Sequence, residues 1–173
     1  ENNDPDTTVF YVNLDFDKEE YEDVLVEDKF SKTILVNKHR MLSEKYTPDD
    51  LVSFKEDEVK GVEEEKANKE VVDAFRKMRE AALEEGLDLK VNSGYRSYQD
   101  QEDIKELYLE AYGQSYVDNY LVKTGYSEHQ TGMSIDVASG SSNIFLESEE
   151  YEWMMENAYL YGFILRYPKS KES

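Results

Sequence analysis

The sequence predicts an α+β fold, in which helices and strands occupy separate stretches of one chain. Apolar residues recur at three- and four-residue steps over residues 66–85, which is the spacing of one face of a helix. Directly after this stretch, Leu87, Leu89 and Val91 alternate with polar residues, which is typical of a strand with one buried face. The length of 173 residues suits one domain with a single core.

The N-terminal part of the chain is predicted to hold strands, loops and one acidic stretch. Residues 1–8 are polar and are expected to form a flexible linker, whereas residues 9–14 are rich in β-forming side chains and predict a strand. Residues 15–28 are strongly acidic and are interpreted as a solvated helix face, because they lack the central glycine of a calcium-binding EF-hand loop. Residues 33–37 predict another strand, and residues 49–65 predict a solvated, acidic loop.

The second half of the chain is predicted to be mostly helical. Ser97 begins an S-x-x-D capping signal, which favours a helix directly after it. A second, shorter helix is predicted over residues 115–123. Ser148 is expected to start a third helix that Gly162 ends, followed by a closing strand over residues 163–167.

Composition excludes several classes of function. The chain carries 40 acidic and 20 basic residues, a net charge of −20, so it lacks the basic surface that nucleic-acid binding requires. It has no cysteine, which excludes disulfides, thiolate zinc sites and a cysteine nucleophile. No apolar run approaches the ~20 residues that a membrane-spanning helix needs.

The stretch over residues 125–137 (GYSEHQTGMSIDV) pairs a histidine with an aspartate. His129 lies in a polar loop, and Asp136 follows seven residues later within a short apolar run. Imidazole nitrogen and carboxylate oxygen are both normal zinc ligands, and a catalytic zinc usually takes three protein ligands and one water. From spacing alone, a surface loop that enters a core strand, with Asp136 in a cap or salt bridge, is favoured over a metal site.

Arg96 is the second candidate for chemistry. It belongs to the sequence SGYRS, where the predicted strand ends and the next helix begins. A guanidinium at such a turn can hold a carboxylate through two parallel hydrogen bonds. By composition alone, an ion pair with one of the 40 acidic side chains is the favoured interpretation.

Three ordered motifs resemble the zinc D-alanyl-D-alanine carboxypeptidases (VanY-like peptidases). Residues 125–137 reproduce the family pattern S-x-H-x-x-G-x-x-x-D. Residues 91–101 resemble the motif S-G-Y-R-S-x-x-x-Q, and residues 152–169 resemble the C-terminal helix and strand. The resemblance runs from about Ile34 to the end of the sequence. The residues that match the first pattern are Ser127, His129, Gly132 and Asp136.

The resemblance implies a fold and an activity. It implies a single peptidase domain over residues 9–173, with helices on one side of a mainly antiparallel sheet. It also implies a zinc-dependent carboxypeptidase that trims the C-terminal D-amino acid of peptidoglycan stem peptides, with D,D- or L,D-specificity left open. Zinc in such a site polarises the scissile carbonyl and lowers the pKa of its water toward ~7.

Each site residue takes a role from the matching family position. His129 and Asp136 are expected to hold zinc. Arg96 is expected to anchor the free C-terminal carboxylate of the peptide, and Gln101 and Ser127 are expected to contact the substrate.

Two groups of the family site have no counterpart in the sequence. The third zinc ligand, a histidine, and the catalytic base, a glutamate, belong to an E-P-W-H-like segment, and the 173 residues contain none. His39 is the only other histidine, and we expect an exposed loop residue there rather than a ligand. Glu128 is not expected to be the base, because adjacent residues usually point apart. We therefore expect these residues alone to bind zinc weakly and to turn over poorly or not at all.

Two other functions remain open at this point. One is a non-catalytic module of the same fold that binds peptidoglycan peptides, and the other is an acidic surface protein whose site is lost. A continuation into an E-x-x-H segment would favour the enzyme. We expect a monomer, an extracellular or wall-associated location in a bacterium, and a mature or trimmed form, since Glu1 is not an initiator methionine.

Overall fold

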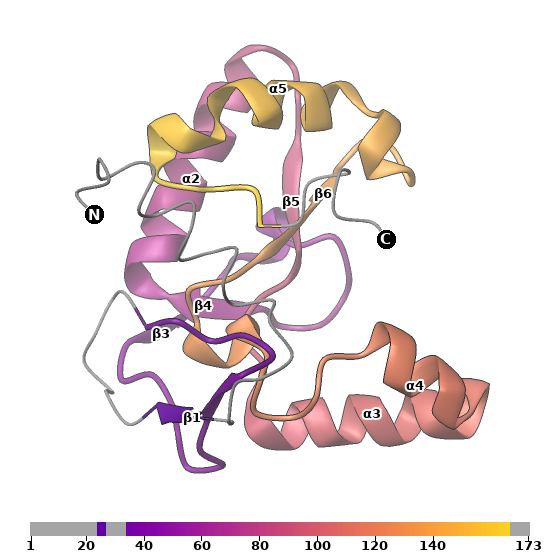
Figure 1. Ribbon diagram of the computed structural model, residues 1–173. Coiled ribbons are helices and arrows are strands. Elements are labelled where there is room, and N and C mark those ends of the chain that lie inside the picture. Colours follow the sequence, from indigo (N-terminus) through magenta and orange to yellow (C-terminus); the bar gives the residue numbers. More distant parts are fainter. Residues whose placement is uncertain (1–23, 27–33, 167–173) are drawn as a thin grey trace, which may run out of the picture. The chain divides into compact units, whose positions relative to one another are not determined.

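The computed structural model describes residues 24–26 and 34–166, which fall into two compact units (Figure 1). The first unit contains the described residues up to Tyr46 together with Tyr98–Glu128. The second unit contains Thr47–Ser97 and the described residues from His129 onward. The described helices are α2 (Lys69–Glu84), α3 (Tyr98–Tyr112), α4 (Gln114–Tyr120) and α5 (Glu149–Asn157). The described strands are β1 (Val24–Val26), β2 (Arg40–Leu42), β3 (Leu51–Ser53), β4 (Lys66–Asn68), β5 (Leu89–Ser93) and β6 (Asp136–Ser139).

Helix α2 supplies most of the core of the second unit. It starts at Lys69 because the Asn68 side chain caps it by accepting a hydrogen bond from the Glu70 N–H. The predicted helix began three residues earlier, but residues Lys66–Asn68 form β4 instead, antiparallel to β3. The core is formed by Phe54, Ala67, Val71, Val72, Phe75, Met78, Ala82, Leu89, Val91 and Trp153.

The pair β5–β6 brings the two candidate motifs together. The strands run antiparallel, with Val91 opposite Val137 and Ser93 opposite Asp136. A register irregularity lies between Val91 and Ser93. The alternation predicted a strand that starts at Leu87, whereas β5 starts two residues later, at Leu89, and continues to Ser93, where it pairs with β6. As a result, the residues that follow Ser93 lie at the same end of the pair as Asp136.

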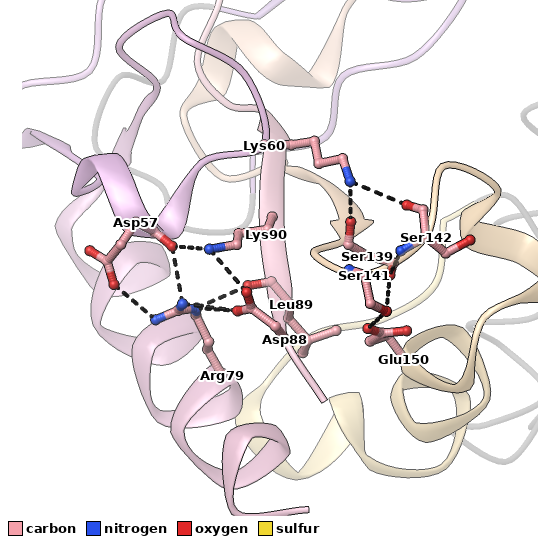
Figure 2. A network of polar contacts seen from close by, with 10 residues as sticks. All are labelled: Asp57, Lys60, Arg79, Asp88, Leu89, Lys90, Ser139, Ser141, Ser142 and Glu150. Carbon is pink, nitrogen blue, oxygen red and sulfur yellow. Dashed lines mark hydrogen bonds and ion pairs between the residues drawn. The ribbon is translucent and has the colours of Figure 1, made fainter. Parts of the chain in front are cut away.

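Two polar networks fasten this strand pair within the second unit (Figure 2). In one, Arg79 of α2 contacts the Asp88 carboxylate at 2.9 Å and donates to the Asp57 carbonyl at 3.0 Å. Lys90 also contacts Asp88, at 3.0 Å. The side chains of Asp88 and Lys90, on either side of Leu89, therefore connect this end of β5 to α2 and to the short 3-10 helix η1 (Glu56–Glu58).

The second network in Figure 2 closes the turn after β6. Lys60 Nζ donates to the backbone carbonyls of Ser139 and Ser142, at 2.7 and 3.2 Å. The Ser141 hydroxyl donates to Glu150 at 2.6 Å, and Glu150 is only 2% exposed. A buried carboxylate is tolerable here because several donors surround it.

The helical stretch that contains α5 begins after Ser148 and ends at Gly162, as the sequence predicts. Ser148 caps it by accepting from the Tyr151 N–H. A 3-10 turn, η4 (Ala158–Tyr161), extends it to Gly162, whose φ of 86° is the left-handed conformation that ends many helices. The closing strand predicted after Gly162 is wrong at residues 163–166, which form no strand.

The first unit contains two helices and a small parallel strand pair. Helices α3 and α4 lie side by side and are joined at Gly113, whose φ is 82° (Figure 1). The rings of Tyr108, Tyr112, Tyr116 and Tyr120 stack along them.

Strands β1 and β2 replace two predicted elements of the first unit. The strand predicted at residues 33–37 is wrong at residues 34–37, where Asn37 makes only an isolated bridge to Arg40, and the strand β2 follows at Arg40–Leu42. The acidic helix predicted at residues 15–28 is wrong at residues 24–26, which form β1. The linker, the strand at residues 9–14 and the rest of that acidic stretch lie outside the described residues.

The α+β prediction is confirmed. The described strands form three two-stranded pairs, of which the two in the second unit are antiparallel. Among the described residues, no helix is both long and apolar enough to cross a membrane.

Candidate functional site

His129 is held with one ring nitrogen against the protein backbone. It lies on the 3-10 helix η2 (Glu128–Thr131), and its Nδ1 is 2.7 Å from the Gly94 carbonyl oxygen. A carbonyl can only accept, so Nδ1 carries the hydrogen and the Nε2 of the neutral ring keeps its lone pair. Gly132, with a φ of 70°, closes the turn by donating to the His129 carbonyl at 3.2 Å.

Asp136 faces the other ring nitrogen. His129 Nε2 and Asp136 Oδ2 are 3.5 Å apart. Two atoms that each lie 2.0–2.2 Å from one zinc ion are separated by about that distance. The same contact is also the salt bridge that the sequence left open for Asp136, so the role as a metal ligand stays a prediction.

Arg96 joins the same carboxylate. Its Nη2 is 3.5 Å from Asp136 Oδ2, and its Nε donates to the Ser93 hydroxyl at 3.0 Å. Its backbone N–H donates to the His129 carbonyl at 3.3 Å. The turn after β5 and the helix η2 are therefore fastened to each other, and three predicted site residues form one cluster.

The cluster keeps Asp136 ionised. Burial raises the pKa of the Asp136 carboxyl, whereas the hydrogen bond and charge of His129 and the charge of Arg96 lower it. The lowering effects are larger, so the pKa of Asp136 lies below its usual value of 3.8. The Asp136 carboxylate and His129 Nε2 thus face one point.

Glu65 is a neighbour of this cluster that the sequence did not single out. Its Oε2 accepts a hydrogen bond from the Gly94 N–H at 2.7 Å. Burial raises the pKa of the Glu65 carboxyl above its usual value, although the Gly94 N–H and the charge of Arg96 oppose the rise. The sequence places Glu65 at the end of an acidic run, and no feature of that run distinguishes it from its solvated neighbours.

The predicted substrate contacts Gln101 and Ser127 belong to the first unit. Gln101 is 8% exposed, and its Oε1 accepts from the Gly125 N–H at 3.0 Å. This bond holds the turn at Gly125, where the φ of 86° favours glycine. Ser127 is half-buried. The role of both residues toward a substrate stays a prediction.

The remaining candidates make no third ligand among the described residues. His39 is half-buried rather than exposed, and its backbone N–H donates to the Asn37 side chain at 2.9 Å. Within residues 24–26 and 34–166, no three His, Cys, Asp or Glu side chains are grouped so as to hold a metal ion. The donor types and spacing of His129 and Asp136 fit two positions of a zinc site.

In this α+β chain, an imidazole, a carboxylate and an arginine thus lie together at the end of one strand pair. The sequence model of the D-alanyl-D-alanine carboxypeptidase family (VanY) matches residues 64–173, and the chain belongs to this family.

Known proteins of this kind are similar over most of the chain. The putative carboxypeptidase YodJ of Bacillus subtilis (strain 168) is 38% identical over 149 residues, which is 80% of this chain and 53% of that protein. The solved LdcB LD-carboxypeptidase is 38% identical with a TM-score of 0.71, over 80% of this chain and 68% of that one. A vancomycin-resistance D,D-pentapeptidase VanY, solved in complex with Zn(II), is 26% identical with a TM-score of 0.64, over 80% and 78%. The chain spans about half or less of the length of the curated relatives it matches.

Proposed function

We propose that this protein is a zinc-dependent carboxypeptidase that removes the C-terminal D-amino acid from peptidoglycan stem peptides. The observation that carries the proposal is the convergence of His129 Nε2 and Arg96 Nη2 on one oxygen of Asp136, each at 3.5 Å. The family and its solved members add support, since one is described by its peptidoglycan recognition and another is complexed with Zn(II).

His129 and Asp136 are the residues that would hold the metal. Lewis-acid polarisation of the scissile carbonyl and activation of a water molecule are what a bound zinc supplies in such sites. The Nδ1–H bond to Gly94 directs the Nε2 lone pair of His129 toward Asp136, as is usual for a zinc-binding histidine.

Arg96 would anchor the free carboxylate at the end of the peptide. Its side chain is one third exposed, and its Nε is fixed by Ser93, so the side chain is both oriented and accessible to solvent. A guanidinium–carboxylate pair can form two parallel hydrogen bonds, which fixes where the peptide ends. We assign Gln101 and Ser127 to substrate contact on the family pattern alone.

The test is zinc binding together with D-alanine release from a stem pentapeptide and a stem tetrapeptide. In protein that includes any downstream E-x-x-H segment, we expect His129→Ala to abolish both, because it removes a nitrogen ligand, while the matched variant His39→Ala leaves both unchanged. Equal loss from both histidine variants would contradict the assignment. The two peptides separate D,D- from L,D-specificity.

A second candidate function is a peptidoglycan-peptide binding module without turnover. It is favoured by one observation: among the described residues, His129 and Asp136 have no third metal-binding side chain grouped with them. Saturable peptide binding by the zinc-loaded protein, without any release of D-alanine, would support this module. Either function uses a wall peptide, so we place the protein outside the bacterial cell or in its wall.

A further inference from the structure

We propose that Glu65 is a positioning residue that sets the orientation of the His129 ring by fixing the backbone of Gly94. The Glu65 carboxylate accepts from the Gly94 N–H at 2.7 Å, and the Gly94 carbonyl accepts from His129 Nδ1–H at 2.7 Å. The chain of bonds therefore runs from an anion, through one residue, to the imidazole. Its consequence for metal affinity rests on the proposed function above.

The position of Gly94 is fixed on both sides. The Tyr95 N–H donates to the Lys66 carbonyl at 2.6 Å, so residues 65 and 66 hold residues 94 and 95 through two consecutive bonds. A Cβ on Gly94 would lie 2.2 Å from the Lys66 carbonyl oxygen, which leaves room for glycine only. The close approach of these two segments is what directs the Gly94 carbonyl at His129.

The anionic acceptor matters because of its charge. A backbone N–H bonds more strongly to a carboxylate than to a neutral oxygen. A strong bond to the Gly94 N–H therefore holds the backbone of residue 94 in place and keeps its carbonyl directed at His129 Nδ1–H. This favours the ring form whose Nε2 lone pair faces Asp136, the form that can bind a metal.

A plain structural clamp would predict something different. If Glu65 only fastened the turn after β5, its loss would lower stability and leave the histidine tautomer unchanged. If Glu65 positions the ring, its loss should move the His129 proton from Nδ1 toward Nε2, the site that a histidine side chain free in water prefers. The tautomer of His129 in the zinc-free protein therefore separates the two roles.

The experiment compares Glu65→Ala, Glu65→Gln and the control Glu63→Ala, which removes an exposed charge from the same acidic run. Nitrogen-15 NMR reports the tautomer in zinc-free protein, and a His39 variant assigns the two histidine signals. Competition with a chromophoric chelator gives the zinc Kd.

In wild type we expect the Nδ1–H tautomer. In Glu65→Ala we expect a shift toward Nε2–H and a zinc Kd about 10–100-fold higher, the usual effect of losing such a supporting bond. Glu65→Gln keeps a neutral acceptor and should fall between the two, and it also serves if the alanine variant does not fold. Glu63→Ala should match wild type.

An unchanged tautomer and Kd in folded Glu65→Ala would overturn the proposal, as would an equal effect of Glu63→Ala. If wild type bound no zinc at all, the proposed function would fail. The tautomer measurements on zinc-free protein would still decide the role of Glu65.

Discussion

At the scale of single residues, the site is organised around one carboxylate. Asp136 Oδ2 lies 3.5 Å from both His129 Nε2 and Arg96 Nη2. A metal ion and a substrate carboxylate carry opposite charges, so a site for both needs an anion and a cation close together. Asp136 and Arg96 supply that pair, and the lowered pKa of Asp136 keeps its charge at neutral pH.

Replacing Arg96 with alanine should weaken the binding of peptides that end in a free carboxylate. Hydrogen bonds to charged groups contribute about 1.5–3 kcal/mol, so the Kd should rise about 10–150-fold. Calorimetry with a stem peptide and its C-terminally amidated form checks this result. The amidated peptide should bind both proteins alike, and Lys77→Ala, at an exposed position, is the matched control. Equal losses for the two peptides would contradict the anchoring role.

At the scale of elements, close approach between β4 and the end of β5 fixes the turn that carries Arg96. Gly94→Ala should therefore destabilise the protein by about 1–3 kcal/mol or more, because the added methyl group meets backbone that cannot move away. Urea unfolding measures the change. Gly61→Ala is the control, since a Cβ there meets only one atom, at 4.0 Å. A Gly94→Ala protein of wild-type stability would show that this packing is not restrictive.

The contact between η1 and α2 makes a further contribution to stability, and this contribution depends on pH. Glu58 is 3% exposed and accepts from Arg76 Nε and Nη2 at 2.8 and 2.9 Å and from the Lys55 N–H at 2.7 Å. Burial raises the pKa of Glu58, but these bonds outweigh burial, and the pKa lies below its usual value of 4.5.

A carboxyl with a lowered pKa in the folded state stabilises the fold fully above the pKa of the unfolded chain. That contribution is lost as the pH falls from about 4.5 through the folded-state pKa. Glu58→Gln should lower the free energy of unfolding by about 1–3 kcal/mol at pH 7 and by a smaller amount at about pH 3. Urea unfolding at both pH values tests this. The exposed residue Glu56, changed to glutamine, should show little effect at either pH. A cost for Glu58→Gln that does not depend on pH would refute the ionic contribution.

At the scale of the whole molecule, the predicted site residues are divided between the two units. His129, Asp136 and Arg96 belong to the second unit, as does their neighbour Glu65, and Gln101 and Ser127 belong to the first. His129 is hydrogen-bonded to Gly94, Arg96 and Gly132, which belong to its own unit. Metal binding is therefore expected to depend on residues of the second unit, whereas the substrate contacts assigned to Gln101 and Ser127 rest on the family pattern.

Gln101→Ala should separate these two properties. Loss of the bond from the Gly125 N–H disturbs the turn before Ser127, so we expect a higher Kd for the stem peptide. The zinc Kd should stay at the wild-type value, because no ligand or ligand support is changed. Measuring the peptide Kd and the zinc Kd on one preparation tests whether the two properties are separate. Gln114→Ala, on the exposed part of α4, is the control. A parallel loss of zinc affinity would contradict it.

The sequence by itself determined the local elements and the motif residues. The periodicity of α2, the Ser148 cap of α5 and the alternation in β5 are local signals, because each depends on neighbours within one element. The patterns around Arg96 and His129 likewise named the candidate site. The strand predicted at residues 33–37 and the closing strand predicted at residues 163–167 are wrong where the structure describes them, because short strands depend on a partner, and pairing, not local composition, selects them.

Only the tertiary structure decided how the site is held. Glu65 reaches the site through Gly94, which lies 29 residues further along the chain, and Asp136 meets Arg96 across 40 residues. The approach of Lys66 to Gly94 sets where that carbonyl points, and so which nitrogen of His129 faces Asp136. Such contacts arise when separate segments pack, so a glutamate in an acidic run acquires a role that its neighbours in the sequence do not indicate.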